Sequence, residues 1–237
     1  MGRYMKETPD HRIVLITGII GIFAAIMVGT GEFLLHYSPA ADYADDGNYV
    51  YLLKVSEWRI TTGHFLGVMG APFYLIGFWH IYLGLKPYGK IIPYLVFFIS
   101  AYGFIFGTVW IGSRASIALL AQANYAAEGH NSIVLRELMD FYILHSETLL
   151  EVIRATTLIS SLAFIILVVS GKTLYPRWMA LFNPIVLLVS SFILFAVAPE
   201  IGKYTMPIAL NMGYFLFFSL STLQLMKVCK QSHGKGI

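Results

Sequence analysis

The chain has 237 residues, of which 57% are hydrophobic and only 12% are charged, with a formal net charge of +3. A soluble domain carries about 25% charged residues, so this composition, together with several apolar runs of about 20 residues or more, indicates a polytopic membrane protein. The basic residues are dispersed, which argues against a nucleic-acid partner. The single cysteine, Cys229, excludes an internal disulfide and a multi-cysteine metal site.

The apolar runs predict an all-α membrane bundle of six transmembrane helices, forming one domain over residues 1–237. We expect the spans at about 13–35, 60–85, 91–112, 141–170, 178–198 and 207–226. The first run has one alternative, because Ser38-Pro39-Ala40 loosely resembles a signal-peptide cleavage site. The apolar region before it exceeds the roughly 7–15 residues of a signal peptide, which favours a membrane helix.

The second expected span carries a strip of small residues, which permits the close approach of another helix. The strip consists of Gly63, Gly67, Gly70 and Ala71. Pro72 follows it and cannot donate a backbone hydrogen bond, so the sequence predicts a kink there.

The third expected span contains Gly103-x-x-x-Gly107, a pattern typical of close helix contacts. The segment 115–140 that follows is weakly helical. It either lies along the membrane surface or extends the two flanking helices.

The distribution of Lys and Arg predicts the orientation of the bundle. Ten of the 16 lie in the two tails and in the loops after the second and fourth spans. The positive-inside rule therefore places both termini in the cytoplasm, for a multi-pass protein of the inner (plasma) membrane. The ten are Arg3, Lys6, Arg12, Lys86, Lys90, Lys172, Arg177, Lys227, Lys230 and Lys235.

This orientation gathers polar residues from all six spans in the outer half of the bundle. In the fourth span, Glu147, Glu151, Arg154 and Leu158 share one helix stripe. A charge near the bilayer centre costs ~2.5–3.5 kcal/mol, so such residues usually face a protein interior or a water-filled cavity. We therefore expect a polar cavity that faces the outer side.

His145 and Glu151 are the candidate acid/base residues, because histidine titrates near neutral pH and a carboxylate can orient it. Structural alternatives stand beside them: Glu151 with Arg154 as an ion pair, and Arg114 as an anchor of a helix end to lipid head groups. No paired-histidine spacing or phosphate-binding glycine loop is present, so we expect no metal and no cofactor. The candidate ligand-binding residues are Glu32, Arg59, His64, Arg114, Glu147, Arg154 and Asn211.

The segment 56–87, SEWRITTGHFLGVMGAPFYLIGFWHIYLGLKP, together with the acidic end of the first span, resembles a family of uncharacterised bacterial integral membrane proteins. The resemblance implies the multi-span fold and transfers no activity. The expected partners are membrane lipids and a small or lipid-like ligand in the cavity, with acid/base catalysis left open. Two alternatives remain: a secondary transporter or proton-coupled carrier, and a non-catalytic assembly or sensor subunit.

Overall fold

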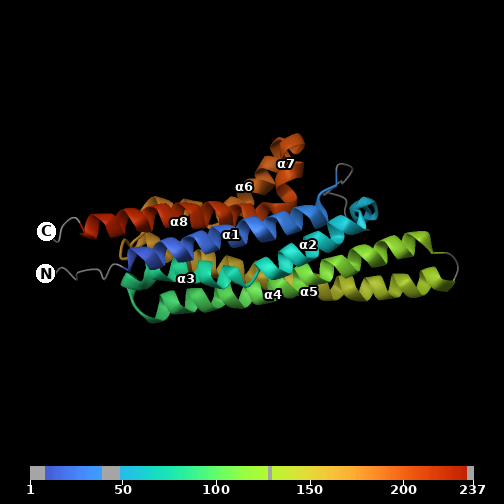
Figure 1. Ribbon diagram of the computed structural model, residues 1–237, viewed down its shortest axis with the longest axis horizontal. Coiled ribbons are helices and arrows are strands. Elements are labelled where there is room, and N and C mark those ends of the chain that lie inside the picture. Colours follow the sequence, from blue (N-terminus) through green and yellow to red (C-terminus); the bar gives the residue numbers. More distant parts are fainter. Residues whose placement is uncertain (1–8, 39–48, 128–129, 234–237) are drawn as a thin grey trace.

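The structure is a computed structural model that describes residues 9–38, 49–127 and 130–233. These residues form helices and contain no strand, which confirms the all-α class. The elements are α1 (His11–His36), η1 (Val50–Lys54), α2 (Glu57–Gly70), α3 (Phe73–Leu85), η2 (Lys86–Tyr88), α4 (Ile91–Ala126), α5 (His130–Val169), η3 (Arg177–Phe182), α6 (Pro184–Val197), α7 (Pro199–Thr205), η4 (Met206–Ile208) and α8 (Ala209–His233). The start of α1 and the end of α8 lie at the same end of the bundle (Figure 1).

Five helical segments of the described chain are long and apolar enough to cross a membrane. The sixth expected span, 178–198, contains the apolar helix α6, which has only 14 residues. At about 1.5 Å per residue α6 measures about 21 Å, less than the ~30 Å of a hydrocarbon core. The five segments are His11–His36, Glu57–Tyr88, Ile91–Ala126, Asn131–Val169 and Pro199–Ser232.

The second span is broken at the predicted position. Helix α2 ends at Gly70 and α3 begins at Phe73, with Pro72 between them. Because proline has no backbone N–H, the helical hydrogen bond at this residue is lost. The predicted kink is confirmed, and it places Ala71 beside the cavity described below.

The small residues of α2 allow its backbone to touch that of α1. A Cβ added to Gly31 of α1 would lie 2.6 Å from the Gly67 nitrogen and 2.7 Å from the Gly63 oxygen. No real side chain fits at such distances, so glycine is required on both helices. The expected close approach at this strip is confirmed, with α1 as the partner.

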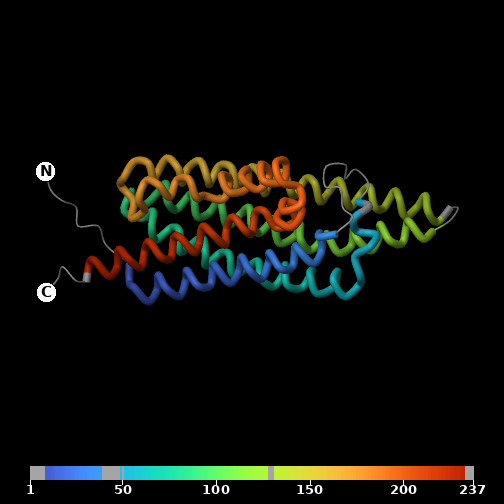
Figure 2. The backbone as a smooth tube through the Cα atoms, turned by 90° about the horizontal axis from the view of Figure 1, so that it is seen from above, coloured from blue at the N-terminus to red at the C-terminus, as the bar shows by residue number. Residues whose placement is uncertain are grey.

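The Gly103-x-x-x-Gly107 pattern of α4 faces α5. A Cβ on Gly103 would lie within 3 Å of the Thr156 side chain, whereas one on Gly107 would meet only Ile153, at 3.9 Å. Beyond this contact both helices continue, so the segment 115–140 extends the flanking helices rather than lying across the bundle. The resulting hairpin reaches past the ends of α1 and α2 (Figures 1 and 2).

Two groups of buried side chains hold the bundle together. One fills the middle of the bundle and the half where α1 begins with aromatic rings, including Tyr74, Phe78 and Phe218. The other lies at the opposite end, where Leu52 of η1 packs with Ile111 and Ile117 of α4. The cavity lies beside the first group, toward the end of the molecule where η1 packs.

Candidate functional site

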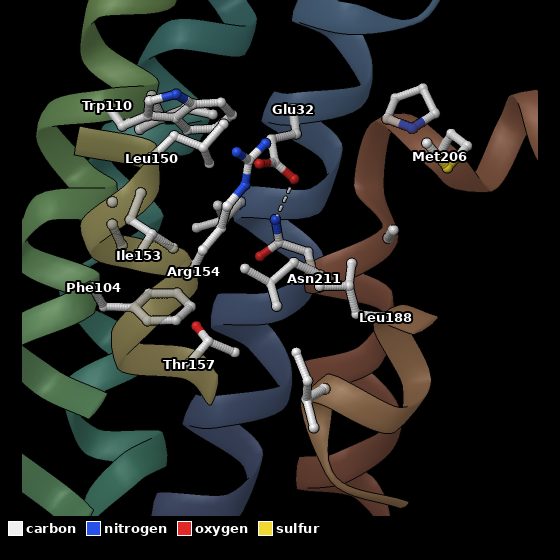
Figure 3. Close-up of a pocket in the computed structure, with 18 of the residues that line it drawn as sticks. Glu32, Phe104, Trp110, Leu150, Ile153, Arg154, Thr157, Leu188, Met206 and Asn211 are labelled. Atoms are coloured by element: carbon white, nitrogen blue, oxygen red, sulfur yellow. Dashed lines mark hydrogen bonds between the residues drawn. The ribbon is translucent and has the colours of Figure 1, made fainter. Parts of the chain in front are cut away.

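A cavity of about 260 Å³ lies where α5, α6 and α8 face α1 and α4 (Figure 3). Apolar side chains of all these helices supply most of its wall. An apolar cavity of about 150 Å³ holds one benzene molecule, so this one has room for a larger group. Its lining consists of Val28, Glu32, Ala71, Phe104, Gly107, Trp110, Ile111, Leu150, Ile153, Arg154, Thr157, Ile185, Leu188, Phe192, Met206, Pro207, Ala209, Leu210 and Asn211.

Asn211, in the first turn of α8, organises the polar side of the cavity. Its Nδ2 donates a hydrogen bond of 2.5 Å to Oε2 of Glu32 on α1, and its Oδ1 accepts one from the hydroxyl of Tyr74 on α3. Asn211 and Tyr74 are both buried. Since the carboxylate and the hydroxyl require opposite ends of the amide, the side-chain orientation of Asn211 is fixed. Oε1 of Glu32 makes no hydrogen bond to the described residues.

Arg154 reaches the same cavity from α5. Its Nη1 donates to Oε1 of Glu151 at 2.5 Å, one turn away on the same helix. The two side chains are 57% and 67% exposed, so this pair lies at the rim. Glu32 and Arg154 also line one cavity, yet they form no ion pair within 4.0 Å among the described residues. Figure 3 shows the Arg154 guanidinium extending toward the side where Glu32 lies.

Trp110 of α4 also lines the cavity, and its indole carries one hydrogen-bond donor. Its Nε1 is buried and has no hydrogen-bond partner in the described part of the chain. Buried donors in folded proteins are almost always paired, with protein, water or a ligand. The donor of Trp110 is therefore unpaired but closed off from the cavity, whereas Oε1 of Glu32 is an acceptor without a partner in the described residues.

Next to Trp110, a buried arginine closes the end of the bundle where η1 packs. Arg114 of α4 donates from Nε to Nε2 of His36 at 3.0 Å and from Nη2 to the hydroxyl of Tyr51 at 2.6 Å. Its guanidinium carbon lies 4.9 Å from the centre of the Tyr49 ring and 5.4 Å from that of Trp110. These contacts attach α4 to the end of α1 and to η1, so Arg114 is held inside the protein and does not reach lipid head groups.

The hydrogen bond from Arg114 also determines the tautomer and the charge of His36. A guanidinium has only donors, so Nε2 of His36 must carry the lone pair and the ring must be neutral, with its proton on Nδ1. The positive charge of this cluster is therefore that of Arg114, and Glu147 lies close to it, since its Oε1 accepts a hydrogen bond from the Tyr49 hydroxyl at 2.9 Å.

The model of a family of unknown function, DUF6796, matches residues 5–228. The chain belongs to DUF6796. The expected resemblance to an uncharacterised family is thereby confirmed, and the match covers every helix that forms the cavity. No curated protein and no solved structure matches the chain.

In this DUF6796 chain, four of the seven candidate ligand-binding residues do not line the cavity. Arg114 and Glu147 belong to the adjoining cluster, and Arg59 and His64 lie elsewhere. Arg59 donates from Nη2 to the carbonyl oxygens of Tyr37 at 2.5 Å and Phe33 at 3.3 Å, so it caps the end of α1. His64 is half-buried on α2, and its Nδ1 has no hydrogen-bond partner in the described residues. Neither side chain lines the cavity.

The two candidate acid/base residues are not brought together by the fold. His145 is exposed, its ring lies 4.0 Å from the ring of Phe141, and its Nδ1 lies 2.7 Å from the Phe141 carbonyl oxygen. Glu151 faces outward and pairs with Arg154. The ion pair considered for Glu151 and Arg154 is observed, whereas Arg114 is buried among protein groups and is no anchor to lipid head groups. Neither His145 nor Glu151 lines the cavity.

Of the predicted site residues, the fold gathers Glu32, Arg154 and Asn211 around one cavity, with Arg114 in the adjoining cluster. Sequence reasoning missed Tyr74 and Trp110, since an aromatic residue in an apolar span carries no polar signal of its own. Among the described residues, no three His, Cys, Asp or Glu side chains are grouped so as to hold a metal ion.

Proposed function

We propose that this protein is an integral membrane protein with six spans and cytoplasmic termini, and that its cavity binds a small amphiphile or part of a lipid. The sixth span would combine α6 with η3, whose six residues add about 12 Å at about 2.0 Å each. The two elements together reach about 33 Å, enough for a ~30 Å hydrocarbon core. The excess of Lys and Arg at the end where α1 begins and α8 ends supports the orientation.

The depth of the polar groups supports a site within the membrane. Arg154 lies about 22 Å along α5 from Val169 at about 1.5 Å per residue, which corresponds to the outer half of a ~30 Å core. Ionisable groups at this depth are costly, and they usually mark a ligand or ion pathway. Arg154 and Glu32 are therefore better explained by a bound polar group than by packing alone.

The observation that carries the proposal is the separation of polar from apolar side chains in the lining of the cavity. The side chains of Glu32, Asn211 and Arg154 lie close together, and most of the remaining lining is apolar (Figure 3). An amphiphile matches this arrangement, because its head group can satisfy the unused hydrogen-bonding atoms while its apolar part displaces nothing polar. Catalysis is not part of the proposal, since the candidate acid/base residues lie outside the cavity.

The experiment is native mass spectrometry of the purified protein, with identification of co-purified lipids, for the natural chain and cavity-filling variants. Gly107→Leu fills the cavity from α4, where an added Cβ has 3.9 Å of clearance, and Leu188→Trp fills it from α6. Ala123→Leu, at an exposed position of α4, is the control.

We expect bound amphiphile in the natural chain and in the control, and its loss in both cavity variants while each remains folded by size-exclusion chromatography. Equal ligand content in all four proteins would overturn the proposal.

A further inference from the structure

We infer that the head group recognised by this cavity is zwitterionic, with a primary ammonium group and a phosphate or carboxylate group. The inference rests on the proposed function and specifies its ligand. It begins from the two opposite charges in the lining, Glu32 and Arg154, which come from different helices and do not pair with each other. A ligand that carries both charges can bind both residues at once.

Glu32 is arranged to receive a hydrogen-bond donor. Asn211 donates to Oε2 only, and Oε1 makes no hydrogen bond to the described residues. Because the Asn211 amide is held by Tyr74, it cannot turn to cover Oε1 as well. A primary ammonium has three N–H donors, one of which can satisfy this oxygen with a charge-assisted hydrogen bond.

Arg154 supplies donors for an anionic group. Within the described residues only its Nη1 is bound, to Glu151, so the rest of the planar guanidinium is available for a phosphate or carboxylate. A purely anionic ligand would use these donors but would be repelled by Glu32.

A trimethylammonium head group fits this lining poorly. It has no N–H to donate to Glu32, and proteins bind it in cages of aromatic faces. The Trp110 ring already has the Arg114 guanidinium 5.4 Å from its centre, and this positive charge disfavours a second cation at the same ring. The cavity therefore selects the ammonium that can donate hydrogen bonds.

The test compares short-chain lipids that share acyl chains and differ in head group, added to delipidated protein and measured by native mass spectrometry and thermal shift. The probes are dioctanoyl phosphatidylethanolamine, phosphatidylcholine and phosphatidylglycerol, and free phosphoethanolamine distinguishes a soluble ligand from a lipid. We expect the affinity for the ethanolamine lipid to exceed that for each of the other two lipids by a factor of about ten or more. This factor is the scale of one charge-assisted hydrogen bond.

Variants separate the head-group inference from the proposed function. Glu32→Gln should abolish the preference for ethanolamine over choline, and Arg154→Gln should weaken binding of every phosphate-bearing probe. Glu200→Gln and Lys203→Gln are matched controls, because these residues form an exposed i,i+3 pair on α7 outside the cavity. Melting temperature and size-exclusion profile show whether each variant is folded.

Each outcome tests either the proposed function or the head-group inference. Binding of none of the probes, lipid or free, would overturn the proposed function. Binding without head-group preference, a preference for phosphatidylglycerol, or an unchanged preference in folded Glu32→Gln would overturn the inference and leave the function standing. Binding of free phosphoethanolamine as tightly as the lipid would support the head-group assignment and identify a soluble ligand.

Discussion

Asn211 on α8 donates a hydrogen bond from Nδ2 to Oε2 of Glu32 on α1, which joins the last long helix of the chain to the first. The same amide accepts a hydrogen bond from Tyr74 on α3. Three helices thus meet through one buried side chain at the wall of the cavity. The hydrogen bond between Asn211 and Glu32 is compatible with a binding site, because it leaves the other carboxylate oxygen of Glu32 without a hydrogen bond from the amide.

Replacing Asn211 by Leu should destabilise the protein, because the Tyr74 hydroxyl loses its acceptor and Glu32 loses its donor. Leaving a buried polar group unpaired costs about 1–3 kcal/mol. Thermal unfolding in detergent measures the effect. Tyr74→Phe removes one of the two bonds and should cost less, while Tyr102→Phe at an exposed position of α4 is the control. A melting temperature of Asn211→Leu equal to that of the natural chain would contradict the expected role of this amide.

Replacing Gly31 by Ala should force α1 and α2 apart. The new Cβ would lie 2.6 Å from the Gly67 nitrogen, and backbone atoms cannot move aside as a flexible side chain can. Overpacking of this kind costs about 1–3 kcal/mol. The loss of stability is measured by thermal unfolding. Gly107→Ala, whose Cβ meets its nearest atom at 3.9 Å, is the matched control and should be tolerated.

Replacing Arg114 by Lys should loosen η1 from α4. A lysine keeps the charge but cannot reproduce the fork that reaches both His36 and Tyr51. We expect faster amide hydrogen exchange over Val50–Lys54, with exchange in α8 unchanged, because α8 makes none of these contacts. Arg136→Lys, at an exposed position of α5, is the control. Unchanged exchange in η1 would show that the guanidinium is dispensable.

Cysteine labelling tests the proposed orientation. In a Cys229→Ser background, Ala123→Cys places a thiol on the α4–α5 hairpin and Lys230→Cys places one near the end of α8, both at exposed positions. We expect a membrane-impermeant maleimide to label Ala123→Cys in intact cells and Lys230→Cys only after permeabilisation. The reverse pattern would place the hairpin in the cytoplasm, and labelling of both in intact cells would rule out the six-span topology.

The stripe of charges on α5 shows where sequence reasoning reached its limit. Spacing places Glu147, Glu151 and Arg154 on one helix face, and they were expected to face the interior. The buried residues of α5 instead include Ser146, Ile153 and Thr157, one residue earlier in each turn and about 100° around the helix. The small hydroxyl residues Ser146, Thr157, Ser160 and Ser161 were the available signal, because such residues mark helix contacts in membranes.

The sequence by itself determined the helices, the break at Pro72, the glycine contact surfaces and the concentration of polar residues toward one end. These properties depend on the length of the apolar runs and on the backbone chemistry of single residues. Only the tertiary structure decided which polar residues meet, bringing Glu32, Asn211 and Arg154 to one cavity and leaving His145 and Glu151 outside it. The physical reason is that lipid-facing and buried surfaces of a membrane helix are equally apolar, so the rotation of each helix is set by its neighbours.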